Sequence, residues 1–212
     1  ERRAPTAGDL LTLRSGIRSR DPQTAILAIR AIGRLERPAL VTDLIPALRF
    51  SLPEVRAEAA NAIGQAAQGW NPSVQRPAGT PDLGSMLTTL AGLLDDEEQP
   101  SVRAALCESI GRLPYQDVSD VARAEAALME MAERADGVPD RLGVAKGFEA
   151  LVRRQHDRRA PSERAVPALR TLAGIDEDDD TNGKPERLRD ARIRRLALEA
   201  LLSANAIDEA LV

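Results

Sequence analysis

Aromatic residues are scarce in this chain of 212 residues, where they make up only 2% of the sequence. A β-sandwich or barrel draws on aromatic and β-branched residues, whereas this chain is built from Ala, Leu and Arg, which favour helices. The composition therefore predicts an all-α protein. Charged residues at 29% and hydrophobic residues at 43% indicate a folded chain rather than a disordered one.

The sequence contains one cysteine, Cys107, and one histidine, His156. A single cysteine excludes an internal disulfide, and one residue of each type leaves no zinc site of the usual ligand set. Neither phosphate-binding glycine pattern, GxGxxG or GxxxxGK[ST], occurs. We therefore assign no catalytic residue, no cofactor and no metal ligand. Whether the segment belongs to an enzyme stays open.

Long apolar runs are also missing, and none reaches the roughly 18 residues that a membrane-spanning helix needs. The formal net charge is −4, which disfavours a polyanionic partner unless the charge is segregated. The sequence starts at Glu1 and ends in IDEALV, which reads as the beginning of another helix. We interpret the chain as a piece of a longer product, and its compartment stays open.

A repeated segment dominates what is present. Three stretches align without gaps: DPQTAILAIRAIGRL from Asp21, LPEVRAEAANAIGQA from Leu52 and QPSVRAALCESIGRL from Gln99. Two degenerate copies start at Val138 and Ala191. In each of the first three copies a proline is suited to the first helical turn, and a glycine follows it eleven residues later. That glycine either lets a neighbouring helix approach closely or ends the helix in a left-handed cap.

An amphipathic segment precedes each copy, which predicts helix pairs. These segments cover residues 10–17, 40–50, 83–94, 121–132 and 164–173. A single pair cannot bury its apolar faces alone, so neighbouring pairs must stack.

These segments resemble HEAT repeats. The resemblance is carried by the PxVR starts at Pro53 and Pro100, by the AIG endings, and by IPAL at Ile45. It implies one array over residues 1–212, a right-handed α-α superhelix of about five helix pairs. We expect pairs at 5–36, 38–68, 82–114, 118–153 and 163–204, with a Pro/Gly-rich loop at 69–82 and an acidic insertion at 174–187.

The resemblance also implies a binding surface. In HEAT repeats the first helix of each pair lies on the convex side, and the second helix lines the concave side. We expect the concave surface to bind a protein or peptide through residues eight and twelve positions past the repeat starts. These are Arg30, Arg34, Asn61, Gln65, Glu108, Arg112 and Lys146. Their mixed charge suits a protein partner more than a polyanion.

A ladder of arginines is implied as well. The arginine of the VR pair in a HEAT repeat bonds an acidic residue in a neighbouring turn. The corresponding residues here are Arg56, Arg103, Arg141 and Arg194, whereas the first copy has Ala25.

The runs from Arg18 to Arg49 and from Val55 to Trp70 are also similar to the helical-repeat region that precedes a cyclophilin-type peptidyl-prolyl isomerase domain in some bacterial proteins. This resemblance implies the N-terminal, non-catalytic scaffold part of a larger, exported protein, and a cytoplasmic location is the alternative if the resemblance does not hold. The isomerase activity would lie in another domain, because the β-barrel and catalytic arginine of a cyclophilin are not in these residues.

A basic patch supports an alternative function, nucleic-acid binding. It consists of Arg153, Arg154, Arg158 and Arg159 around His156. Arginines of this kind contact phosphates. No aromatic residue is interleaved for base stacking, however, and arginines at a helix C-terminus also complement the helix dipole. Protein binding therefore stays the leading hypothesis.

The acidic insertion begins like an EF-hand calcium loop. Its first ligand positions and turn glycine are matched by Asp178, Asp180, Asn182 and Gly183. Calcium needs a bidentate carboxylate at the twelfth position of such a loop, and Arg189 stands there. The segment is therefore predicted to be a solvated insertion and not a calcium site.

Overall fold

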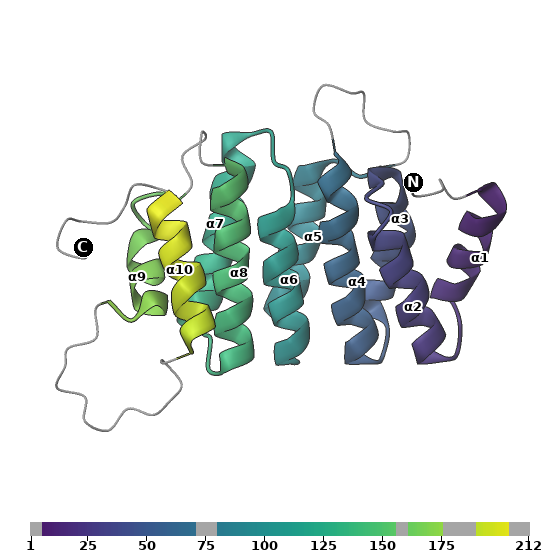
Figure 1. Cartoon of the computed structure of the whole chain (residues 1–212), viewed down its shortest axis with the longest axis horizontal. Helices are drawn as coiled ribbons and strands as arrows, with labels where there is room; N and C mark the ends of the chain where they lie inside the picture. Colours follow the sequence, from purple (N-terminus) through teal and green to yellow (C-terminus); the bar gives the residue numbers. More distant parts are fainter. Residues whose placement is uncertain (1–5, 71–79, 156–160, 176–189, 204–212) are drawn as a thin grey trace.

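The computed structural model describes residues 6–70, 80–155, 161–175 and 190–203, and every regular element within these ranges is a helix. The helices form pairs that stack side by side in two layers, an α-solenoid (Figure 1). The first helices are α1 (Ala7–Ile17), the broken segment η1 (Pro38–Leu40), α3 (Val41–Leu44) and η2 (Ile45–Arg49), then α5 (Leu83–Asp96), α7 (Val118–Glu133) and α9 (Val166–Ala173). The second helices are α2 (Pro22–Gly33), α4 (Pro53–Ala66), which runs on into η3 (Ala67–Gly69), then α6 (Pro100–Arg112), α8 (Val138–Gln155) and α10 (Ala191–Ser203).

The repeat proline begins α2, α4 and α6, as predicted. A side-chain cap accompanies it only in α2, where the Asp21 carboxylate accepts a hydrogen bond of 2.9 Å from the Thr24 amide. The missing proline N–H costs nothing at this position. The apolar residue two positions after the repeat start is buried in the second, third and fifth copies, where Val55, Val102 and Ile193 are at most 4% exposed.

The first helix of the second pair differs from the continuous segment expected at 40–50. It is split into η1, α3 and η2. Pro46 lies within this stretch and has no N–H to donate to the carbonyl four residues earlier, so the backbone tightens into a 3-10 turn. The apolar side chains still reach the core, because Leu44 and Leu48 are buried.

The recurring glycines hold the second helices close together. A Cβ built on Gly33 would lie 2.8 Å from the Ala62 Cα, and one on Gly64 would lie 3.0 Å from the Ser109 Oγ. Left-handed caps are not the reason for these glycines, because the described residues with positive φ are Glu36 and Gly174. Of the two roles left open by the sequence, close helix approach is the one observed.

The second-helix layer is packed more tightly than the first-helix layer. Consecutive second helices contact each other extensively, whereas the first helices touch their neighbours far less. Closer spacing in one layer bends a stack toward that layer, which favours a curved surface lined by the second helices. We call the exposed surface of α2, α4, α6, α8 and α10 the second-helix face.

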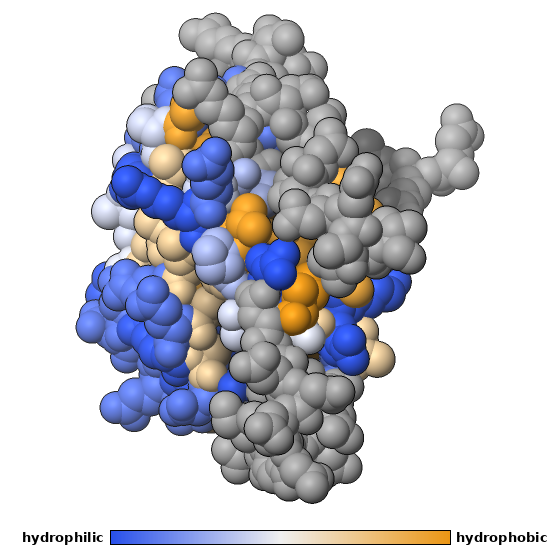
Figure 2. All heavy atoms as spheres, turned by 90° about the vertical axis from the view of Figure 1, so that its left-hand side faces the viewer, coloured by the Kyte–Doolittle hydropathy of each residue, from blue (hydrophilic) through white to orange (hydrophobic). Residues whose placement is uncertain are grey.

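The two ends of the array expose apolar side chains. Leu11 and Leu27 are 66% and 61% exposed at the α1/α2 end, and Leu202 of α10 is 60% exposed at the other. Figure 2 shows hydrophobic side chains at the end formed by the last pairs. Leu27 is aligned with Ala105 of the third copy, which is buried.

Candidate binding surface

Two arginines of the predicted ladder join consecutive pairs. Arg56 donates to both carboxylate oxygens of Glu97, at 2.9 and 2.8 Å, and Arg103 does the same to Asp140, at 3.0 and 2.7 Å. Each guanidinium also donates to carbonyls in its own pair, such as those of Phe50 and Glu98. The ladder is thus confirmed at these two positions, where it ties the second pair to the third and the third pair to the fourth.

The ladder changes toward the end of the array. Arg194 donates to the Ala173 carbonyl, at 3.1 Å, rather than to a carboxylate in the described residues. Arg141 lies where Arg56 and Arg103 lie in their helices and lines a small cavity. The resemblance therefore identified the position of these arginines correctly but not all of their partners.

Ion pairs cross the second-helix face between neighbouring helices. Arg30 donates to both oxygens of Glu58, at 3.0 and 2.7 Å. Glu108 accepts from Lys146 at 2.8 Å and also pairs with Arg112. Of the residues predicted to bind a partner, Arg30, Glu108 and Lys146 therefore contribute at least partly to helix packing.

Three other predicted residues come together at the C-terminal ends of the second helices. Arg34 of α2, Gln65 of α4 and Arg112 of α6 line one open hollow of about 640 Å³, with Glu36 and Gln68. We call this the polar hollow. The sequence spacing predicted this row, because each residue lies twelve positions past a repeat start. Asn61, in the other predicted row, is partly exposed on α4.

The described part of the basic patch continues from this hollow. Arg153 and Arg154 lie in the last turn of α8. Arg153 pairs with Glu149 at 3.3 Å, whereas Arg154 is partly buried and forms no ion pair with a described residue. Burial lowers the pKa of Arg154, and the positive charges of Arg153 and Arg112 lower it further. The concave row and the basic patch, two separate sets in the sequence, are neighbours in the fold.

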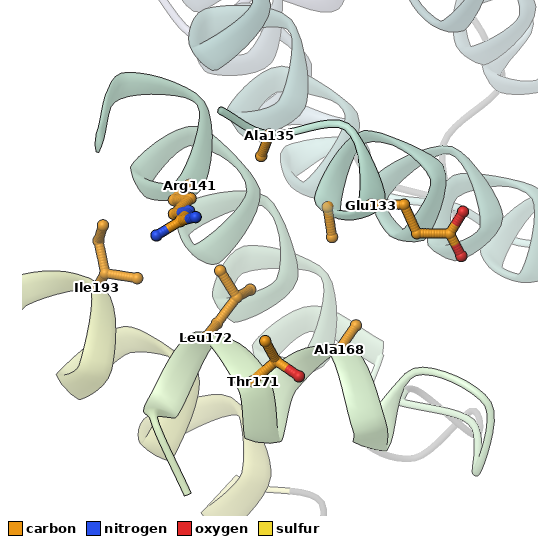
Figure 3. Close-up of a pocket in the computed structure, with 8 residues that line it drawn as sticks. Glu133, Ala135, Arg141, Ala168, Thr171, Leu172 and Ile193 are labelled. Carbon is orange, nitrogen blue, oxygen red and sulfur yellow. The ribbon is translucent and has the colours of Figure 1, made fainter. Parts of the chain in front are cut away.

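A smaller apolar cavity of about 320 Å³ lies between α7, α8, α9 and α10 (Figure 3). Its polar groups do not converge, because the Glu133 carboxylate points away from the Arg141 guanidinium in Figure 3. Ala135, Leu172 and Ile193 supply apolar walls. A catalytic site needs convergent polar groups in its pocket, and this lining does not provide them.

Within the described ranges no group of three or more His, Cys, Asp or Glu residues is arranged to hold a metal ion. Burial raises the pKa of the Cys107 thiol to about 12, so this cysteine behaves as a small apolar residue of the core. None of the helices in the described ranges is both long enough and apolar enough to span a membrane.

Several predicted features fall outside the described residues. They are Arg158, Arg159 and His156 of the basic patch, residues 71–79 of the Pro/Gly-rich loop, and residues 176–187 of the acidic insertion with its calcium-like stretch. Predictions about them stay predictions.

One family model agrees with this architecture. Residues 10–89 match the family model for HEAT repeats. The crystal structure of an engineered protein shares 14% sequence identity with this chain, covers 93% of it and 97% of its own length, and gives a TM-score of 0.48. No curated protein matches the sequence. The described residues form an all-helical α-solenoid, and residues 10–89 are similar to HEAT repeats.

Proposed function

We propose that this α-solenoid is a non-catalytic scaffold module that binds a protein through the second-helix face. The observation that carries the proposal is the polar hollow, where Arg34, Gln65 and Arg112 come from three successive helices to one place. A stack of helix pairs presents such residues in a row, which suits an extended segment of a partner.

The mixture of charges supports a protein partner. Cations and carboxylates alternate on this face, as in Arg30 with Glu58 and Lys146 with Glu108. A nucleic acid would bring phosphates against those carboxylates as well as against the arginines. HEAT repeats are a scaffold that typically mediates protein interactions, which also supports this choice.

The resemblance of residues 18–49 and 55–70 to the region before a cyclophilin-type isomerase domain suggests the larger context. We propose that the array presents a client protein to a fused peptidyl-prolyl isomerase domain, in which all catalysis would reside. Sequencing of the complete gene tests this part, because an adjoining cyclophilin barrel supports it and any other adjoining domain contradicts it.

Site-specific photo-crosslinking tests the use of the second-helix face. Benzoylphenylalanine placed at Asn61 should crosslink a discrete set of cellular proteins, each of which then binds the array when purified. The matched control places the same group at Glu130, which is exposed on α7 in the other layer. Equal crosslinking from both positions, or none from Asn61, would show that this face is not the interface.

A further inference from the structure

The C-terminal ends of α2, α6 and α8 gather arginines whose charge is not fully neutralised. Arg34 is exposed and forms no ion pair with a described residue. Arg112 pairs with Glu108, but that carboxylate is shared with Lys146. Arg154 likewise has no carboxylate partner in the described ranges, although it is partly buried. We call Arg34, Arg112, Arg153 and Arg154 the arginine row.

The arginine row carries an excess of positive charge on a chain whose net charge is −4. Among the described residues around the polar hollow and the end of α8, five cations accompany three carboxylates. The cations are Arg34, Arg112, Lys146, Arg153 and Arg154, and the carboxylates are Glu36, Glu108 and Glu149. Helix dipoles favour a cation at each of these C-terminal ends, which accounts for an arginine on each helix. The dipole does not occupy the N–H donors of the guanidinium, so these donors can still bind a partner.

We propose that the arginine row binds an acidic, extended segment of a partner protein, whose carboxylates pair with Arg34, Arg112 and Arg154. This inference rests on the proposed protein-binding function and names the chemistry of the partner. A guanidinium binds a carboxylate through two parallel hydrogen bonds. Arg154 is half-buried and has no carboxylate partner among the described residues, so a carboxylate supplied there by a bound segment should be favourable.

The polar hollow supplies what the backbone of such a segment needs. The side chains of Gln65 and Gln68 line the same hollow as Arg34 and Arg112, and each amide can both donate and accept hydrogen bonds. Four helices at spacings of about 9 Å place the ends of the row about 27 Å apart, which an extended segment of about eight residues spans.

An acidic protein segment fits the row better than a nucleic acid does. Base stacking on aromatic side chains drives sequence-tolerant binding of single strands. Tyr115 and Phe148 are buried, and Trp70, two residues after Gln68, is partly buried and packs against the core. Glu36 lines the hollow with Arg34 and Arg112, Glu149 pairs with Arg153, and both carboxylates would repel a continuous line of phosphates. Separate carboxylates on flexible side chains can avoid them.

Fluorescence anisotropy with a labelled twelve-residue peptide of alternating Glu and Ser tests the proposal. We expect saturable binding that weakens at least fivefold between 50 and 300 mM NaCl, because exposed charges are screened. The same peptide with Gln in place of Glu should not bind. Arg34→Gln and Arg154→Gln should each weaken binding several-fold, and the variant with Arg34, Arg112 and Arg154 all changed to Gln should lose it.

The matched control is Arg49→Gln, which removes an exposed arginine from the first-helix layer and should leave the peptide affinity unchanged. Circular dichroism checks that each variant is folded. If the triple variant does not fold, the single variant Arg34→Gln still tests the proposal, because Arg34 is exposed and its replacement should not disturb the fold. Absence of peptide binding, or equal loss in Arg49→Gln, would overturn the proposal.

A twelve-nucleotide oligothymidylate separates the two classes of partner. Tighter binding of this oligonucleotide than of the acidic peptide, with the same dependence on the arginine row, would overturn the proposal in favour of nucleic acid. Failure of the acidic peptide together with crosslinking from Asn61 would reject only the acidic chemistry. Failure of both experiments would reject the proposed function itself.

Discussion

The backbones of Gly111 in α6 and Gly147 in α8 touch. A Cβ built on Gly111 would lie 1.9 Å from the carbonyl oxygen of Gly147 and 2.8 Å from its Cα. Gly147 is equally constrained from its own side, because a Cβ there would lie 2.6 Å from the Cys107 carbonyl oxygen. Two helices of the second-helix layer can approach this closely only if both lack side chains at the contact.

Gly111→Ala should therefore destabilise the array. The new methyl group meets backbone rather than a flexible side chain, so α6 and α8 must separate, at a cost of about 1–3 kcal/mol typical of overpacking. Urea unfolding followed by circular dichroism measures this free energy. An unchanged unfolding midpoint would contradict the close approach of the two helices.

Gly92→Ala is the matched control for this substitution. Gly92 is exposed in α5, and a Cβ there would meet nothing within 4 Å. Alanine should stabilise the helix by about 0.5–1 kcal/mol, because glycine is the poorer helix former. The two Gly-to-Ala changes are thus expected to shift stability in opposite directions.

Removing the carboxylate of Asp140 should weaken the junction between the third and fourth pairs. The Asp140 side chain is 2% exposed and accepts both hydrogen bonds from Arg103. Asp140→Ala leaves a poorly solvated guanidinium without its partner, which should cost about 3–5 kcal/mol. Replacing both residues, as in Arg103→Met with Asp140→Leu, should restore much of this loss.

Glu199→Gln is the control for the Asp140 variant. Glu199 pairs with Arg195 at 3.4 Å, and both side chains are largely exposed. Pairs of this kind contribute about 0.3–0.5 kcal/mol within a helix. A loss of similar size at Asp140 and Glu199 would mean that the ladder does not hold the pairs together.

Much of this architecture could be predicted from the sequence because the repeat signals are local. The proline starts of α2, α4 and α6, and the amphipathic period that buries Val55 and Val102, depend on neighbouring residues alone. The break at Pro46 shows the limit of such patterns. An amphipathic stretch predicts which side chains are buried, whereas the missing proline N–H decides the backbone geometry.

The candidate surface was less predictable, because its geometry depends on contacts between repeats. Spacing within a repeat predicted the row of Arg34, Gln65 and Arg112. Spacing could not show that Glu58 and Glu108 neutralise part of the positive charge on that face. It also could not show that Arg154 of α8 lies near Arg112 of α6. The recurring glycines Gly33 and Gly64 contact Ala62 and Ser109 of the next copy. Both partners are small residues nine positions past a repeat start, so an alignment of the copies would have shown a recurring small residue at this position.

Cys107 should resist thiol reagents until the array unfolds. Its pKa of about 12, raised mainly by burial, leaves about one thiolate in ten thousand at pH 8. Reaction with Ellman's reagent at pH 8 should be slow in buffer and should follow the unfolding transition as urea is added. Rapid reaction of the native protein would show that the core around α6 opens to solvent.

The Arg56–Glu97 pair predicts a pH dependence of stability. Burial raises the pKa of Glu97, but hydrogen bonds from Arg56 and from the Gln99 amide outweigh it, so the folded pKa lies below the ordinary value of 4.5. A depressed pKa contributes stability above the unfolded value, and this contribution is lost as the pH falls through the folded value. Glu97→Gln should therefore lower the free energy of unfolding at pH 7, and its difference from the wild type should shrink below about pH 4.5.

Urea titrations at pH 7, 5 and 4 measure this difference in the free energy of unfolding, with Glu130→Gln as the exposed control on α7. A difference that stays constant over this range would contradict the assigned role of Glu97, because a purely steric loss does not titrate.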